Sequence, residues 1–198
     1  MLSPDQVLEP LARRRTGEVV ITSMALVRPW GRLSAHPLDF ASADSAMGHA
    51  ADLALGIALA RPDRRVICLN GDGSMLMSLG TLVTIAGLRP ANLILVVAEN
   101  RTYEITGNQP IPGAAVVDFA GLAAAAGFPR VERFTDPLAW DAALEDLLPA
   151  DGPTFVALTV TPGTEAPISR GPHEPAAYLR VSLSESAHNL RTALRRQP

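Results

Sequence analysis

The chain alternates apolar runs of strand length with segments of helical length and pattern. The run NLILVVAEN (92–100) is apolar without alternation, and RRVICLN (64–70) and TFVALTV (154–160) indicate further strands. Continuous apolar strands that alternate with helices are typical of a parallel sheet covered on both faces. We therefore predict an α/β fold, with helices on both faces of a doubly wound, mostly parallel sheet.

The expected helices are distributed along the whole chain. Ser3 followed by Pro4 fits the N-cap and first position of a helix that runs to about Arg15. The segment 46–60, AMGHAADLALGIALA, has small and apolar residues all round, which predicts a buried helix. Further helices are expected at 74–88, 117–127, 137–148 and 184–196, and further short strands at 18–23 and 130–134.

Two stretches show little periodicity. Residues 24–45 contain two prolines and a glycine before the helical pattern resumes, and we expect a long loop with at most one short strand or helical turn. Beyond Pro162 the chain contains Pro, Gly and Ser until the last helix. Since no repeat or linker divides the sequence, we predict one domain over 1–198, with an irregular C-terminal extension from about 163.

Composition adds a few limits to this picture. The chain is 47% hydrophobic and 19% charged, with a formal net charge of -3, so neither nucleic acid nor a membrane surface is an expected partner. No apolar stretch is long enough to span a bilayer, and the N-terminus does not have the pattern of a signal peptide. A single cysteine, Cys68, lies in a predicted buried strand. We therefore expect a cytoplasmic protein.

The candidate chemistry lies where two predicted strands end. Gly71-Asp72-Gly73-Ser74 follows the strand predicted at 64–70, and Asn100 ends the strand predicted at 92–100. If these strands are neighbours, Asp72 and Asn100 reach the same crevice at their carboxyl ends. The turn can approach an anion such as a phosphate closely, but a carboxylate beside it requires a cation between them. Carboxylate, amide and phosphate oxygens suit Mg²⁺, although the Gly-Asp-Gly tripeptide alone is also compatible with a simple capped turn.

The spacing of these residues resembles a family motif. Gly71-Asp72-Gly73, 25 intervening residues and then Glu99-Asn100 resemble the thiamine-diphosphate motif. NRTYEITGNQP (100–110) resembles the same region of the sulfopyruvate and phosphonopyruvate decarboxylases, as do the segments 62–86 and 152–163. The resemblance covers roughly residues 40 to 175. It is to the pyrophosphate-binding, C-terminal domain of these enzymes and implies thiamine diphosphate and Mg as cofactors.

The resemblance also implies roles for individual residues. Asp72, the side-chain oxygen of Asn100 and the backbone carbonyl of Thr102 would ligate Mg. Glu99 would support the loop and not act as a ligand. The residues expected to contact the diphosphate, or to belong to the same stretches, are Gly71, Gly73, Ser74, Tyr103 and Ile105.

A second stretch, DSAMGHA (44–50), resembles the segment of the family that shapes the cofactor. There Met47 would support the bent cofactor, and the backbone carbonyl of Ser45 would accept a hydrogen bond from its 4'-amino group. His36 and His49 are candidate catalytic residues, although ordinary structural roles remain open for both. Arg28, Arg32 and Arg101, together with His36, are the cations expected nearest to the site.

The resemblance is to only half of such an enzyme. About seventy residues precede Gly71, too few for the pyrimidine domain that carries the activating glutamate in the family. The chain thus resembles the beta subunit of a split decarboxylase of small 2-oxo acids, with a pyrimidine-domain alpha subunit and at least two copies of each chain. A subunit of a carboligase of the acyloin or acetolactate-synthase type, and a non-catalytic cofactor-binding subunit, stay open as alternatives.

Overall fold

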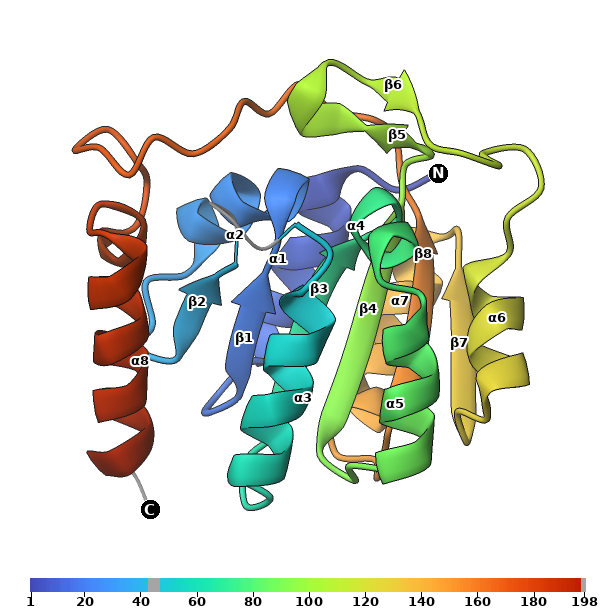
Figure 1. Cartoon of the computed structure of the whole chain (residues 1–198), viewed down its shortest axis with the longest axis horizontal. Coiled ribbons are helices and arrows are strands. Elements are labelled where there is room, and N and C mark those ends of the chain that lie inside the picture. The colour runs from blue at the N-terminus through green and yellow to red at the C-terminus, as the bar shows by residue number, and fades with distance from the viewer. Residues whose placement is uncertain (43–46, 197–198) are drawn as a thin grey trace.

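A six-stranded sheet in the order β2-β1-β3-β4-β8-β7 forms the centre of the molecule, and each pairing within it is parallel (Figure 1). The structure, a computed structural model, describes residues 1–42 and 47–196. The prediction of a doubly wound, mostly parallel sheet is confirmed. The strands are β1 (Val19–Thr22), β2 (Asp39–Ala41), β3 (Val66–Gly71), β4 (Leu93–Glu99), β7 (Arg130–Phe134) and β8 (Thr154–Thr159).

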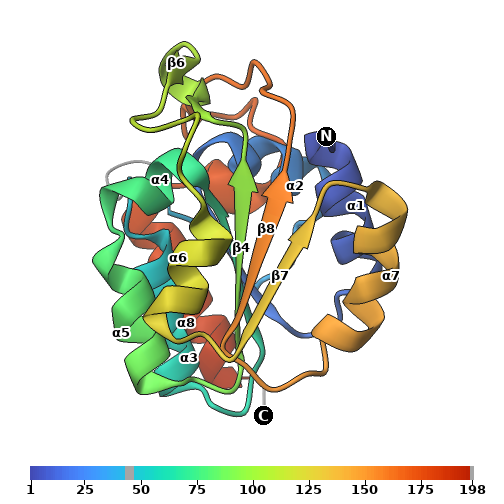
Figure 2. The ribbon, with the colours of Figure 1, turned by 90° about the vertical axis from the view of Figure 1, so that its right-hand side faces the viewer.

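Helices cover both faces of this sheet, as Figure 2 shows. One face carries α3 (Ala50–Ala60), α5 (Gly80–Leu88), α6 (Phe119–Ala126) and α8 (Leu183–Arg196). The other face carries α1 (Pro4–Arg14), α2 (Val27–Leu33) and α7 (Pro137–Leu147). Along β4, alternate residues enter the two cores, Leu93, Leu95 and Val97 on one side and Ile94, Val96 and Ala98 on the other. This double burial explains why the run shows no polar alternation.

The first helix begins as the sequence predicts. The Ser3 side chain accepts a hydrogen bond from the Gln6 backbone N–H, and the Gln6 side chain accepts one from the Ser3 backbone N–H at 2.9 Å. This reciprocal capping box satisfies two backbone donors that a helix end otherwise leaves free.

Two predicted segments differ from the structure. The helix expected at 74–88 is two helices, α4 (Asp72–Met77) and α5, because Ser78 adopts a non-helical conformation between them. The stretch 24–45 contains more structure than predicted, the 3-10 helix η1 (Met24–Leu26), α2 and β2. Its order comes from tertiary contacts, since buried Trp30 donates from Nε1 to Asp39 at 3.1 Å.

The outer faces of α3 and α5 carry exposed apolar side chains. The helix at 46–60 was expected to be buried, but only the inner sides of α3 and α5 are, and Leu53, Leu59, Val83 and Leu88 are exposed. A face of this kind normally faces another apolar surface. Within the described part of the chain, no helix is long and apolar enough to cross a membrane.

The chain beyond β8 crosses above the carboxyl ends of the strands before it reaches α8 beside β2 (Figure 1). This segment contains the 3-10 helix η3 (Ala177–Leu179) and otherwise lacks helices and strands. Beside its start lies a small antiparallel pair, β5 (Thr102–Tyr103) and β6 (Gln109–Pro110), with the 3-10 helix η2 (Glu104–Thr106) between the two strands. The sequence pattern did not predict this pair.

Candidate functional site

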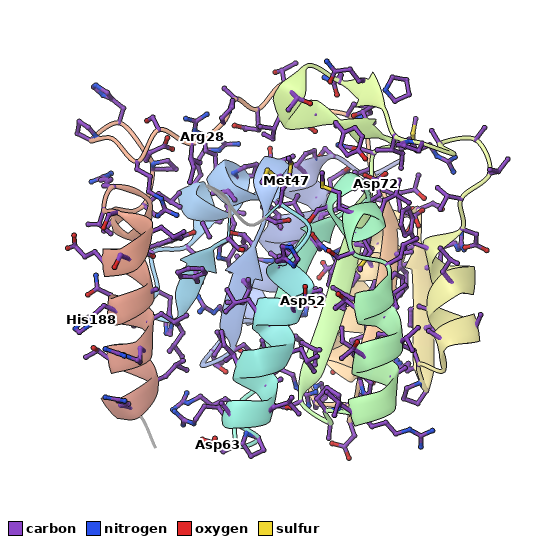
Figure 3. All side chains as sticks on the ribbon, in the orientation of Figure 1. Arg28, Met47, Asp52, Asp63, Asp72 and His188 are labelled. Atoms are coloured by element: carbon purple, nitrogen blue, oxygen red, sulfur yellow. The ribbon has the colours of Figure 1, made fainter. Side chains whose placement is uncertain are left out.

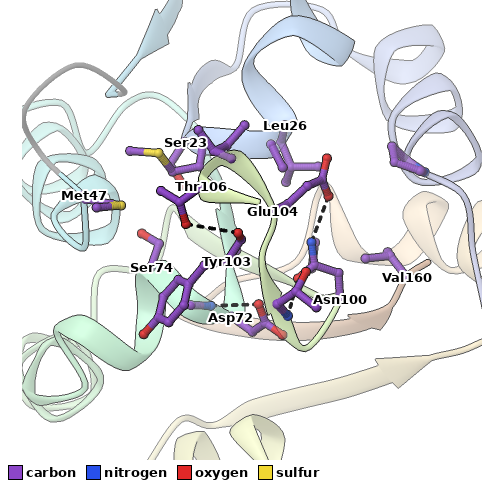
Figure 4. Close-up of a pocket in the computed structure, with 18 of the residues that line it drawn as sticks. Ser23, Leu26, Met47, Asp72, Ser74, Asn100, Tyr103, Glu104, Thr106 and Val160 are labelled. Atoms are coloured by element: carbon purple, nitrogen blue, oxygen red, sulfur yellow. Dashed lines mark hydrogen bonds between the residues drawn. The ribbon is translucent and has the colours of Figure 1, made fainter. Parts of the chain in front are cut away.

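A pocket of about 620 Å³, including its open side, lies at the carboxyl ends of β1, β3, β4 and β8. Met47 and Asp72 both lie at this end of the molecule (Figure 3), and Figure 4 shows the pocket in close-up. This is the end of a parallel sheet at which ligands of α/β proteins bind.

The sheet brings Asp72 and Asn100 to the same pocket. Strands β3 and β4 are neighbours, and Gly71 pairs with Ala98. The residues that follow therefore leave the sheet side by side, and Asp72 Oδ2 accepts a hydrogen bond from the Arg101 backbone N–H at 2.6 Å. Both Asp72 and Asn100 line the pocket, so the predicted condition of a shared crevice is met.

Buried polar groups hold the Gly-Asp-Gly turn from below. The side chain of Asn70 is fully buried, and its Oδ1 accepts hydrogen bonds from Ser23 Oγ at 2.8 Å and from the Gly71 N–H at 3.1 Å. Gly73 donates its N–H to Asp72 Oδ1 at 2.7 Å. These contacts fix the backbone of the turn and the direction of the Asp72 carboxylate.

A second turn lies against the first. Gly48 donates its N–H to Ser74 Oγ at 3.1 Å, and its φ of +90° lies in the left-handed region that glycine tolerates. Met47 precedes this turn, lines the pocket and stays exposed. The Ser74 hydroxyl thus ties the segment that presents Met47 to the Gly-Asp-Gly turn.

The pocket has an acidic lining. Asp72 is only 1% exposed, and burial raises its pKa to about 6, although N–H groups of Arg101 and Gly73 oppose the shift. The other charged lining residue is Glu104, and no Arg, Lys or His is among the described residues that line the pocket. A bare anion is therefore disfavoured here, whereas a cation is attracted.

The oxygen atoms present fit a divalent cation that prefers hard ligands. Each Asp72 carboxylate oxygen accepts one backbone N–H and keeps a further lone pair, and Asn100 Oδ1 accepts only the Thr102 N–H, at 3.0 Å. A Cβ built on Gly71 would meet nothing within 4 Å, so the pocket is open beside the turn. Carboxylate, amide and carbonyl oxygens beside open space suit Mg²⁺ with a phosphate ligand.

The structure brings most of the predicted cofactor residues together. Ser45 lies outside the described residues, and its predicted role stays a prediction. The pocket is lined by Met47, Gly71, Asp72, Gly73, Ser74, Asn100, Thr102, Tyr103 and Ile105.

The two candidate histidines do not line the pocket. His36 precedes β2, at the amino end of that strand, and its Nδ1 lies 3.1 Å from Arg15 Nη2. Burial, followed by the positive charge of Arg15, lowers its pKa. His49 is exposed beside the start of α3, with Nδ1 2.8 Å from Asp52 Oδ2. A catalytic role for either residue stays a prediction.

The cations expected at the rim are engaged elsewhere. Arg28 pairs with Glu174, and Arg32 Nη2 pairs with Glu165 at 2.7 Å. Arg101 donates from Nη1 to the carbonyl of Ala114. None of these side chains lines the pocket.

Several lining residues were not identified from the sequence. Ser23 follows β1 as Asp72 follows β3, so its place at a carboxyl strand end could have signalled it. Nothing in the sequence pattern distinguished Glu104. The remaining ones are Pro4, Met24, Ala25, Leu26, Ala98, Thr106, Val160 and Thr161.

A parallel sheet with a glycine-rich turn and a mostly apolar pocket that contains a few polar groups at the carboxyl strand ends is the arrangement of an α/β cofactor-binding domain. Residues 33–158 match the family described as "Thiamine pyrophosphate enzyme, C-terminal TPP binding domain", and the chain belongs to this family. The predicted family and its cofactor, thiamine diphosphate, are thereby confirmed.

The chain is similar to two decarboxylases of known name. Sulfopyruvate decarboxylase subunit beta of Methanothermobacter thermautotrophicus is 46% identical over 117 residues, which cover 59% of this chain and 60% of that protein. Phosphonopyruvate decarboxylase of Streptomyces hygroscopicus is 39% identical over 143 residues, which cover 71% of this chain and 35% of that protein. The chain therefore matches only part of the length of each.

Solved structures share the fold. The thiamine diphosphate-dependent 4-hydroxybenzoylformate decarboxylase of Rhodococcus jostii RHA1 superposes with a TM-score of 0.68 at 21% identity, covering 83% of this chain and 33% of that one. Benzoylformate decarboxylase of Polynucleobacter necessarius gives 0.62 at 23% identity, with 83% and 34% covered.

Proposed function

We propose that this chain is the diphosphate-binding beta subunit of a split thiamine-diphosphate-dependent decarboxylase of small 2-oxo acids. The observation that carries the proposal is the meeting of Asp72 and Asn100 in one pocket at the ends of β3 and β4. The 46% identity to a sulfopyruvate decarboxylase beta subunit supports the sulfopyruvate or phosphonopyruvate type.

In this proposal Mg²⁺ bridges the chain and the diphosphate. Asp72, Asn100 Oδ1 and the Thr102 carbonyl are its protein ligands, while Gly73 and Ser74 contact the diphosphate. The open space beside Gly71 and the free lone pairs of the two side chains support this assignment. The acidic lining requires the metal, because a diphosphate alone would be repelled.

The overall reaction is simple to state. A 2-oxo acid loses carbon dioxide, and a proton takes its place on the carbonyl carbon, so that an aldehyde is released. The bound cofactor supplies the electron sink for the electron pair that carbon dioxide leaves behind. This chain anchors the diphosphate, and Met47, Tyr103 and Ile105 provide the apolar surface against which the rest of the cofactor is held.

A pyrimidine-domain alpha subunit completes the site in this proposal, with at least two copies of each chain in a cytoplasmic enzyme. The apolar outer face of α3, α4 and α5, which we call the α3–α5 face, supports such a partner. It consists of Leu53, Leu59, Met77, Val83 and Leu88. Because no cation lines the described pocket, the alpha subunit would also supply the group that binds a sulfonate or phosphonate.

Calorimetry tests the cofactor site. Thiamine diphosphate and Mg²⁺ are titrated into the chain mixed with its partner subunit. We expect D72A to weaken Mg²⁺-dependent binding by at least about 100-fold, since it removes a ligand and not merely a supporting group. D63A is the control, since Asp63 lies at the opposite end of the molecule (Figure 3). Binding that survives D72A would overturn the proposal.

Product analysis tests the reaction. Sulfopyruvate and phosphonopyruvate are supplied to the same mixture, and the release of carbon dioxide and aldehyde is followed. A product that forms only when a second aldehyde is added would identify a carboligase. Tight cofactor binding without turnover of any 2-oxo acid would leave a non-catalytic cofactor-binding subunit.

A further inference from the structure

Glu104 is a buried carboxylate that lines the pocket and forms no ion pair within the described part of the chain. It is 7% exposed. Three N–H donors compensate its charge: Asn100 Nδ2 at 2.9 Å and Gly163 N at 2.9 Å to Oε2, and Glu165 N at 3.2 Å to Oε1. A buried carboxylate that accepts hydrogen bonds from three donors on separate segments is held in a defined position by the fold.

The contacts of Glu104 close a ring of hydrogen bonds. Gly163 accepts at its carbonyl from Asn108 Nδ2 at 3.0 Å, and Asn108 Oδ1 accepts from Thr102 Oγ1 at 2.8 Å. Thr102 donates its N–H to Asn100 Oδ1, and Asn100 Nδ2 donates back to Glu104. Gly163 is required for the close approach, because a Cβ there would lie 2.7 Å from Glu104 Oε1.

This ring decides which end of the Asn100 amide faces which neighbour. An amide has an acceptor oxygen and a donor nitrogen of nearly equal size, and rotation by half a turn exchanges them. The Glu104 carboxylate only accepts hydrogen bonds, so it selects Nδ2. The Thr102 N–H only donates, so it selects Oδ1. The reversed amide would place oxygen against a carboxylate and N–H against N–H.

We infer that Glu104 is a positioning residue that holds the Asn100 amide (Figure 4) with its oxygen available to a metal ion. It also ties the chain after β8 to the site. The inference rests on the proposed role of Asn100 as a metal ligand. Glu104 acts through Asn100 and does not need to touch the cofactor. Hydrogen-bonded groups that orient metal ligands typically change metal affinity by about 10- to 100-fold when removed.

Mg²⁺ affinity at saturating thiamine diphosphate, measured by calorimetry on the chain mixed with its partner subunit, tests this role. We expect E104Q to weaken Mg²⁺ binding by about 10-fold or more. The amide oxygen of Gln can take the place of Oε2, but its NH2 group would then face the Glu165 N–H, and the charge that strengthens the bond from Asn100 Nδ2 is lost. E99Q is the matched control. Glu99 is also buried and also lies beside Asn100, but it does not line the pocket and no hydrogen bond joins it to Asn100.

Two further variants, N100D and N100D/E104Q, distinguish a role of Glu104 in orienting the Asn100 amide from a role in tethering Gly163 or in supplying negative charge. In the N100D background, E104Q supplies a donor to a carboxylate and removes the repulsion between two carboxylates. We expect E104Q to tighten Mg²⁺ binding in that background, although it weakens binding in the presence of Asn100. A role limited to tethering Gly163, or to negative charge in the pocket, predicts weaker binding in both backgrounds.

The outcomes distinguish this inference from the proposed function. If D72A abolishes Mg²⁺ binding while E104Q binds like the wild type, the positioning role is wrong and the metal site stands. If D72A leaves Mg²⁺ binding intact, the metal site itself is wrong. If E104Q lowers affinity in both backgrounds, Glu104 does not orient the amide. Thermal unfolding of each variant identifies any loss that arises from misfolding.

Discussion

Gly73 has no side chain, and the ring of Tyr103 lies where one would be. A Cβ on Gly73 would meet Tyr103 Cδ1 and Cε1 at 2.7 Å and Ile111 Cγ2 at 3.3 Å. Gly71, two residues earlier, has open space in the same direction. At the scale of the residue, the two glycines of the turn therefore serve different purposes: one permits packing and the other leaves room in the pocket.

Substitution by Ala should therefore affect stability differently at the two glycines. We expect G73A to destabilise the chain by about 1 to 3 kcal/mol, because the Tyr103 ring must move. We expect G71A to change stability by no more than about 0.5 kcal/mol. Urea unfolding of both variants measures the difference. Equal stability of G73A and G71A would show that the packing of the Tyr103 ring does not require residue 73 to lack a Cβ.

Individual site residues could be predicted from sequence only where a local rule applied. Asp72 and Asn100 lie at the ends of two predicted strands, so the rule for carboxyl strand ends brings them together on the condition, met in the structure, that these strands are neighbours. Glu104 was not predicted as a site residue, because its role depends on a contact with Gly163, 59 residues further along the chain. His36 was expected near the site but lies at the amino end of β2, and His49 lies next to Gly48 without lining the pocket, because their positions in the sequence do not determine which side chains reach the pocket.

A buried ion pair joins the segment that follows β8 to α2. Glu174 is buried, and it accepts from Arg28 Nε at 2.9 Å, from Arg28 Nη2 at 2.7 Å and from the Ser169 N–H at 2.7 Å. The hydrogen bonds from Arg28 lower the pKa of Glu174 to about 2, with further help from Ser169. At the scale of the element, this contact fastens an otherwise irregular segment to α2.

Acid should weaken this attachment in a defined window. Because the folded pKa lies below the ordinary value of 4.5, the carboxylate stabilises the fold fully above about pH 4.5, and the stabilisation is lost as pH falls toward 2. We expect E174Q to cost about 3 kcal/mol at pH 7 and to flatten the loss of stability between pH 4.5 and 2. Urea unfolding as a function of pH measures both effects.

The neighbouring pair provides the control. Glu165 binds Arg32, whose side chain is about half exposed, and exposed pairs contribute only about 0 to 1 kcal/mol. E165Q should therefore leave both the stability and its pH dependence nearly unchanged. If E174Q behaves like E165Q, the buried pair does not fasten the segment.

Elements with a strong pattern of their own were predictable, and elements that depend on contacts elsewhere were not. The apolar run of β4 and the capping box of α1 are local signals. The break at Ser78 and the elements within 24–42 are not. The latter depend on Trp30, Asp39 and a segment more than a hundred residues later. Propensity along the chain does not record such contacts.

At the scale of the whole molecule, five of the large exposed apolar residues gather on the α3–α5 face. The α3–α5 face lies on one side of the sheet, beside the turn that presents Met47 to the pocket. α5 contains no charged residue. A surface that adjoins the pocket and contains few charges is suited to burial by a second chain that also completes the site.

A single charge on this face should therefore prevent assembly without unfolding the chain. Val83 is 65% exposed on α5, so V83E costs little in the isolated chain, but in a complex it would bury an unpaired carboxylate. We expect V83E to abolish co-migration with the alpha subunit in size-exclusion chromatography and the activity of the mixture. Leu138 is 78% exposed on α7, across the sheet, and L138E should assemble normally. If instead L138E prevents assembly and V83E does not, the partner occupies the other side of the sheet, and the α3–α5 face no longer explains how the pocket is completed.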